Sequence, residues 1–156
     1  MLFQKPSLTT TMPSWTNDSL LEQRIKTHEG ESPYVYEDTL GYATIGYGRC
    51  IDKRIGAGLT TDEMLYLLRN DISRSKKQLQ PYNWYVILDE VRKGVLIELC
   101  FNIGLPKLLK FRNTLLALSV LDYNKAADEL LASIWARQVG PLRSNDMTNR
   151  LRHGTY

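Results

Sequence analysis

Two carboxylates and one hydroxyl lie in a short stretch of this chain whose residues could bring them to one small volume. Glu29 ends a segment of helical character, Asp38 lies in an expected turn, and Thr44 follows on the returning strand. Glycoside hydrolysis needs such convergence, because one carboxyl protonates the leaving oxygen while a second, on the opposite face of the sugar, activates water or attacks. The candidate chemistry is therefore cleavage of a bond between sugars.

Each of these residues also has an ordinary structural explanation. Acidic residues are common at helix ends and turns, and the sequence of 38–41 is by itself a common turn signal. The neighbouring residues favour the functional interpretation, because the pair Glu29-Gly30 and the segment 41–48 rarely occur with this spacing by chance. We therefore interpret the stretch as a candidate active site.

The first 60 residues predict one helix followed by a β-hairpin. A capping box at 19–22 opens an amphipathic helix that runs to about His28, and Gly30 is well placed to end it. Residues that favour strands follow on both sides of a turn that contains Gly41. The expected strands lie within 34–36 and 42–49, and a third short strand can follow around 55–59.

Beyond residue 60 the pattern is helical. A second capping box at 60–63 starts a helix expected over roughly 61–79, and Pro81 marks its latest end. Asp89 can cap a helix with a broad apolar face that Gly104 ends, which makes it the candidate central core helix. The remaining helices are expected near 113–120, near 122–131, around Trp135, and from Pro141 to before Gly154.

The chain has the composition of a soluble globular protein. Its residues are 43% hydrophobic and 24% charged. A length of 156 residues is sufficient for one folded unit with a hydrophobic core, and this unit can have one lobe or two. No apolar run is long enough to cross a membrane. Residues 1–17 are rich in Pro, Ser and Thr, so we expect a flexible extension followed by a folded unit over 18–156.

Cysteine and histidine usage predicts neither a disulfide framework nor a metal site. Cys50 and Cys100 are too few to cross-link a chain of this size, and Cys100 lies in an apolar run that favours a buried thiol. We expect two free thiols and a reducing cytoplasm as the site of synthesis. His28 and His153 lack metal-ligand spacing, so no metal or other cofactor is expected.

The stretch from Glu29 to Thr44 closely resembles the catalytic region of phage-type lysozymes, in which Glu, eight residues, Asp, five residues and Thr form the signature. Two further blocks, 91–104 and 135–143, extend the resemblance to about residues 18–154. It implies an α+β, mainly helical, lysozyme-like fold. A small β-hairpin lobe, about 30–60, would be joined by a long helix, about 61–79, to a helical lobe, about 80–156, that also takes in the N-terminal helix.

The resemblance also implies roles for the candidate residues. The protein would be a muramidase, with Glu29 as the acid and Gly30 supporting it. Asp38 would hold the attacking water and Thr44 would position it, which predicts an inverting mechanism. Asp38 as a direct nucleophile is the mechanistic alternative.

Residues of the second half complete the implied site. Phe101 and Thr114 would line the saccharide cleft, and Arg143 would lie against Glu29. Two positions depart from the usual pattern of the family. Arg49 stands where many relatives carry a histidine, with Asp71 as its matching acid, and Cys50 replaces a residue of the cleft that is typically apolar.

The charge is unevenly distributed along the chain. Counting Lys and Arg against Asp and Glu, residues 1–102 hold 12 and 13, whereas residues 103–156 hold 8 and 4, so the net charges are −1 and +4. A basic second half would attract an anionic polymer such as peptidoglycan with its peptide carboxylates. Nucleic acid is a poorer candidate because the arginines are sparse and no recognised nucleic-acid motif accompanies them.

These observations predict an endolysin that acts on bacterial cell-wall peptidoglycan during phage-induced lysis of the host cell. We expect a monomer without membrane insertion, held in the host cytoplasm until release. The first residues show no signal peptide, so another protein would deliver it to the wall. The alternative is a phage tail-associated or toxin-like lysozyme module that acts mainly as a wall-binding component.

Overall fold

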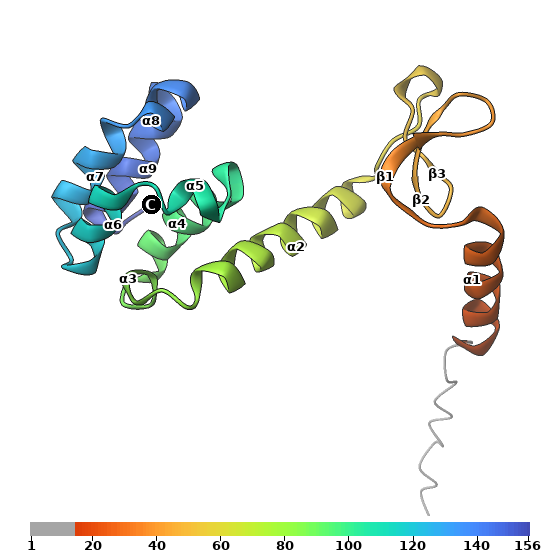
Figure 1. The fold of residues 1–156 in the computed structure, drawn as a ribbon, viewed down its shortest axis with the longest axis horizontal. Coiled ribbons are helices and arrows are strands. Elements are labelled where there is room, and N and C mark those ends of the chain that lie inside the picture. Colours follow the sequence, from red (N-terminus) through yellow and green to blue (C-terminus); the bar gives the residue numbers. More distant parts are fainter. Residues whose placement is uncertain (1–14) are drawn as a thin grey trace, which may run out of the picture. The chain divides into compact units, whose positions relative to one another are not determined.

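The computed structural model describes residues 15–156, which divide after Thr60 into two compact units (Figure 1). The first unit contains one helix and a three-stranded antiparallel sheet, and the second contains helices alone. The fold is therefore α+β, mainly helical and lysozyme-like, as the sequence predicts. No helix within residues 15–156 has the length and apolar character that crossing a membrane requires.

The elements of the first unit are α1 (Trp15–Glu29), β1 (Ser32–Glu37), β2 (Ala43–Gly46), β3 (Arg49–Cys50) and a short 3-10 helix (Lys53–Ile55). Those of the second are α2 (Thr61–Leu79), α3 (Asn83–Val86), α4 (Glu90–Ile103), α5 (Leu105–Leu108), α6 (Arg112–Ser119), α7 (Tyr123–Leu131), α8 (Ile134–Val139) and α9 (Pro141–His153).

Helix α1 begins earlier than the capping box at 19–22 predicts. It starts at Trp15, so residues 15–17 of the expected extension are helical, while residues 1–14 lie outside the described part of the chain. The end of α1 is confirmed. Gly30 takes a positive φ of 71°, which favours glycine, and its N–H donates to the carbonyl of Lys26 at 3.1 Å.

The expected hairpin is present, with β2 in the centre of the sheet in the order β1-β2-β3. Tyr36 of β1 pairs with Thr44, and Thr44 pairs on its other side with Cys50 of β3. The prediction of a third strand at 55–59 is wrong. Gly46 and Gly48 both take positive φ, and the chain makes a tight turn there. The turn divides the predicted strand 42–49, so that β2 ends at Gly46 and β3 begins at Arg49.

Most helices of the second unit have the predicted bounds. Helix α2 covers 61–79 as expected, and α4 begins after Asp89, whose side chain accepts a hydrogen bond from the Arg92 N–H at 3.0 Å. Helix α4 ends before Gly104, and α9 begins at Pro141. The single-turn helices α3 and α5 were not predicted, and neither has a side-chain hydrogen bond at its N-cap.

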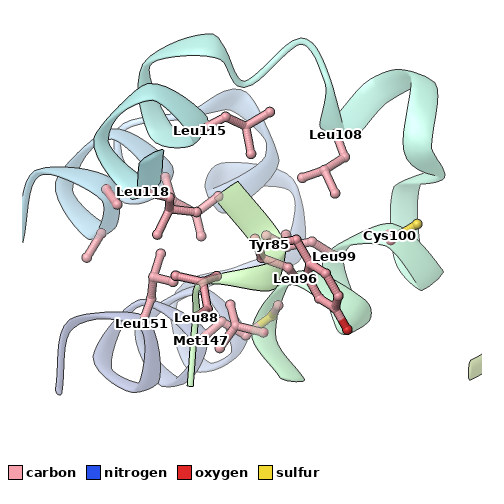
Figure 2. Packing of buried hydrophobic residues seen from close by; sticks show 14 of the residues in the cluster. Tyr85, Leu88, Leu96, Leu99, Cys100, Leu108, Leu115, Leu118, Met147 and Leu151 are labelled. Atoms are coloured by element: carbon pink, nitrogen blue, oxygen red, sulfur yellow. The ribbon is translucent and has the colours of Figure 1, made fainter. Parts of the chain in front are cut away.

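The core of the second unit is built around α4. Leu96 and Leu99 of α4 are fully buried, and Figure 2 shows side chains of α6 and α9 packed with them. Burying one leucine stabilises the folded state by about 1.5–3 kcal/mol. The buried thiol of Cys100 belongs to this core, and Cys100 and Cys50 are both free, as predicted.

Arg92 joins the beginning of α4 to the end of the chain. Its Nε donates to the carbonyl of Leu151 at 2.7 Å, and its Nη2 donates to the carbonyl of Arg152 at 2.8 Å. The guanidinium also lies 3.5 Å from the ring centroid of Tyr123, on α7. One side chain thus connects α4, α7 and α9, and it supplies partners for carbonyls near the end of α9, which intrahelical bonds leave open.

Candidate active site

Glu29 is the last residue of α1, and its carboxylate lies against the turn between β2 and β3. A Cβ placed on Gly48 would lie 2.7 Å from Oε2 of Glu29. The carboxylate is exposed, and with Gly30 and other residues it lines a small pocket of about 220 Å³. The end of the helix therefore presents an accessible carboxyl beside the sheet.

Asp38 holds the turn between β1 and β2 with one oxygen and leaves the other open. Its Oδ1 accepts hydrogen bonds from the N–H groups of Leu40 at 2.8 Å and Tyr42 at 2.9 Å, and its own N–H donates to the Tyr42 carbonyl at 3.0 Å. Oδ2 has no hydrogen-bond partner among the described residues. That oxygen is able to hold a water molecule and accept its proton.

Thr44 is buried on β2, with 3% of its surface exposed. Its hydroxyl donates to the carbonyl of Tyr42 at 3.0 Å. Since a hydroxyl has one donor and two acceptor lone pairs, Thr44 can still accept a hydrogen bond from water. The Tyr42 carbonyl thus receives both the N–H of Asp38 and the hydroxyl of Thr44, and it brings the two residues together.

The remaining predicted site residues belong to the second unit. Phe101 of α4 is 47% exposed, whereas Thr114 of α6 is 2% exposed and lines a pocket of about 680 Å³ beside Trp135. Phe101 lines a different pocket, of about 770 Å³. The predicted contacts between Arg143 and Glu29 and between Arg49 and Asp71 each join residues of different units, and they stay predictions.

Comparison with known proteins decides the family. A family model described as phage lysozyme matches residues 26–152. The chain belongs to the phage lysozyme family. Two relatives from Dictyostelium discoideum, "Probable T4-type lysozyme 1" and "Probable T4-type lysozyme 2", are each 28% identical to it over 88% of this chain and 96% of their own length. This phage lysozyme family member is a glycoside hydrolase, a muramidase whose substrate is peptidoglycan.

Sequence reasoning missed the carboxylate that pairs with Arg143. In the structure, Nη2 of Arg143 lies 3.3 Å from Oε1 of Glu98, on α4, while Oε2 of Glu98 pairs with Arg150 at 2.8 Å. The Nε of Arg143 is buried without a hydrogen-bond partner among the described residues. Glu98 occupies one position within an apolar run, which gives no indication in sequence that it pairs with two arginines 45 and 52 residues further along.

Sequence reasoning also missed Asp52, which bonds to the Ala43 N–H, just after the turn between β1 and β2 of this lysozyme. Among residues 19–156 it is the only buried carboxylate, with 6% of its surface exposed. Hydrogen bonds from the Arg54 side chain, and then from the N–H groups of Ala43 and Arg54, hold the pKa of Asp52 well below its usual range. In sequence, 52–54 looks like an ordinary surface charge run.

Residues 15–156 contain no group of three or more acidic, His or Cys residues arranged to hold a metal ion.

The lowered pKa of Asp52 predicts a loss of stability in acid. The carboxylate of Asp52 binds a proton less tightly in the folded state than in the unfolded state, where an aspartate titrates at about pH 3.9, so protonation favours unfolding. We expect the difference in unfolding free energy between wild type and Asp52→Asn to have its largest value at neutral pH. It should decrease as the pH falls below about 4. Urea unfolding across this range measures it, and a constant difference would contradict the assignment.

Proposed function

We propose that this lysozyme cleaves the β-1,4 bond between N-acetylmuramic acid and N-acetylglucosamine by direct attack of water. The observation that carries the proposal is the joint anchoring of Asp38 and Thr44 at the Tyr42 carbonyl. It leaves Oδ2 of Asp38 and the lone pairs of the Thr44 hydroxyl without a hydrogen-bond partner among the described residues, which supports one water molecule held by both groups. Two neighbouring acceptors fix the orientation of a water better than either acceptor alone.

The proton transfers of this reaction balance. Glu29 donates its proton to the glycosidic oxygen as the bond from that oxygen to the anomeric carbon breaks. The water oxygen bonds to the anomeric carbon, and Oδ2 of Asp38 takes one of the water protons. Thr44 accepts a hydrogen bond from the O–H group that carries the other water proton. Glu29 ends ionised and Asp38 ends protonated, so one proton must move through solvent before the next turnover.

This mechanism predicts that the anomeric configuration inverts. An inverting enzyme leaves about 6.5–9.5 Å between its carboxyls to admit water, whereas a retaining enzyme closes the gap to about 5–5.5 Å. We expect the β-linked wall to release an α-anomer first. Proton NMR of the fresh reducing end, recorded before mutarotation, distinguishes the two outcomes. A β-anomer as first product would make Asp38 a nucleophile and leave Thr44 without its role.

For substrate binding we propose the pocket that contains Thr114, together with the exposed ring of Phe101 for contact with sugar. Thr114 is the buried polar residue of the pocket lining. The lining also contributes three cationic side chains, those of Lys107, Lys110 and Arg112. Their charges fit the carboxylates of the peptides that are attached to the glycan.

We propose lysis of a bacterial host at the end of phage growth as the biological role. The enzyme would act as a monomer and would be released from the host cytoplasm to the wall by another protein. The intact set Glu29, Asp38 and Thr44 supports turnover over mere wall binding by a tail-associated or toxin-like module. Clearing of a suspension of purified peptidoglycan with release of reducing sugar is the expected result. Binding without release would favour the non-catalytic alternative.

A further inference from the structure

An ion pair between the buried carboxylate of Asp52 and the exposed guanidinium of Arg54 holds the turn that carries Asp38. Nη2 of Arg54 lies 2.6 Å from Oδ2 of Asp52, and Nε of Arg54 donates to both carboxylate oxygens, at 2.9 and 3.0 Å. The Asp52 side chain is 7% exposed, whereas that of Arg54 is 61% exposed. A buried carboxylate is costly unless it is paired and hydrogen-bonded, and Asp52 meets both conditions through Arg54 and the Ala43 N–H.

The pair holds two consecutive peptide groups, each from the side opposite to the candidate catalytic residues. In the first group, the Gly41 carbonyl accepts a hydrogen bond from Nη2 of Arg54, while the Tyr42 N–H donates to Oδ1 of Asp38. In the second, the Ala43 N–H donates to Oδ2 of Asp52 at 2.9 Å, while the Tyr42 carbonyl accepts from the N–H of Asp38.

The second peptide group also fixes Thr44, whose hydroxyl donates to the same Tyr42 carbonyl. A peptide group is planar, so holding one of its ends fixes the direction of the other. A hydrogen bond from the Ala43 N–H to a carboxylate also polarises the carbonyl of that group and strengthens the bonds it accepts. The hydrogen bonds of Asp38 and Thr44 to this turn therefore depend on Asp52 and Arg54.

We propose that Asp52 and Arg54 are positioning residues that hold Asp38 and Thr44 in their catalytic geometry through these two peptide groups. This inference rests on the proposed function of Asp38 and Thr44. Neither Asp52 nor Arg54 needs to touch substrate. A small displacement of a reacting group is enough to slow catalysis, so loss of the pair should lower turnover more than substrate binding.

Arg54→Ala tests the proposal, because the exposed side chain can be removed with little effect on packing. We expect kcat to fall roughly 10- to 100-fold, with KM within about twofold of wild type. Lys53→Ala is the matched control, since it removes an exposed cation from the neighbouring residue of the same 3-10 helix. It should keep wild-type kcat. A folded Arg54→Ala enzyme with wild-type kcat would overturn the proposal.

Two further readouts separate positioning from a general loss of stability. Guanidinium ion, below denaturing concentrations, should restore part of the kcat of Arg54→Ala by occupying the place of the removed side chain. If the variant is only destabilised, guanidinium ion should lower its kcat further. Hydrogen exchange of the Leu40 and Tyr42 amides, which bond to Asp38, should accelerate in this variant. The amide of Ile51, which donates to the Ala43 carbonyl at 2.8 Å, should not change.

The exchange measurement also distinguishes failure of this proposal from failure of the proposed function. If wild type does not hydrolyse peptidoglycan, the proposed function fails, and faster exchange at Leu40 and Tyr42 in Arg54→Ala would still support the positioning of Asp38. If wild type is active and the exchange rates at both amides are the same in the variant, the positioning role is wrong.

Discussion

Glu29→Gln is expected to abolish wall hydrolysis, with activity reduced by about 10²- to 10⁴-fold, the usual contribution of a general acid. The amide keeps the size of the side chain but has no proton to donate to the leaving oxygen. Because the carboxylate is exposed, we expect the folded structure and the melting temperature to stay close to those of wild type. Release of reducing sugar from peptidoglycan measures the loss.

Glu31→Gln is the control for this experiment. Glu31 is exposed, carries the same charge and lines the same small pocket two residues further along. Its variant should hydrolyse peptidoglycan almost as fast as wild type, so a specific loss at Glu29 would separate the acid from the local charge. Lysis by a well-folded Glu29→Gln protein would remove Glu29 from the mechanism.

Gly48→Ala is expected to reduce activity by about 10²-fold, the cost of misplacing a catalytic group by about 1 Å. The new Cβ would lie 2.7 Å from Oε2 of Glu29, so the carboxylate must move away from the β2–β3 turn. The flexible side chain moves at small cost. The positive φ of 78° adds about 1–2 kcal/mol of destabilisation for a residue with a side chain. Activity should therefore fall far more than stability.

Gly58→Ala provides the comparison. Gly58 has no positive φ, and a Cβ there would have no neighbour within 4 Å, so the substitution should leave both activity and melting temperature near wild type. The two variants are compared by initial rates on peptidoglycan and by thermal unfolding. Equal activity in the Gly48→Ala enzyme would mean that the position of the Glu29 carboxylate against this turn is not needed for catalysis.

The sequence could predict those features whose causes are local. Helix α2 begins just after the predicted capping box, and α4 lies between the Asp89 cap and Gly104, because capping and helix termination depend on neighbours a few residues away. The spacing of Glu29, Asp38 and Thr44 was equally visible, and all three belong to the first unit.

Features that depend on distant partners could not be predicted. The end of β2 and the existence of β3 follow from backbone angles at Gly46 and Gly48, and a glycine inside a strand-like segment does not reveal whether it will turn the chain. The carboxylate of Asp52 accepts a hydrogen bond from the N–H of Ala43, nine residues earlier. The burial of Asp52 results from tertiary packing, which the pattern of charges in the sequence does not reveal.

The contacts of Arg92 have a consequence for when this enzyme can fold during synthesis. Arg92 donates to the carbonyls of Leu151 and Arg152, 59 and 60 residues later, and Leu151 is itself a core residue. The hydrogen bonds of the turn between β1 and β2, by contrast, span at most 13 residues. The turn can therefore form before synthesis of the chain is complete, whereas the helical unit has to wait for the last residues of the chain. A lysozyme translated only in part would carry this turn without a complete helical core.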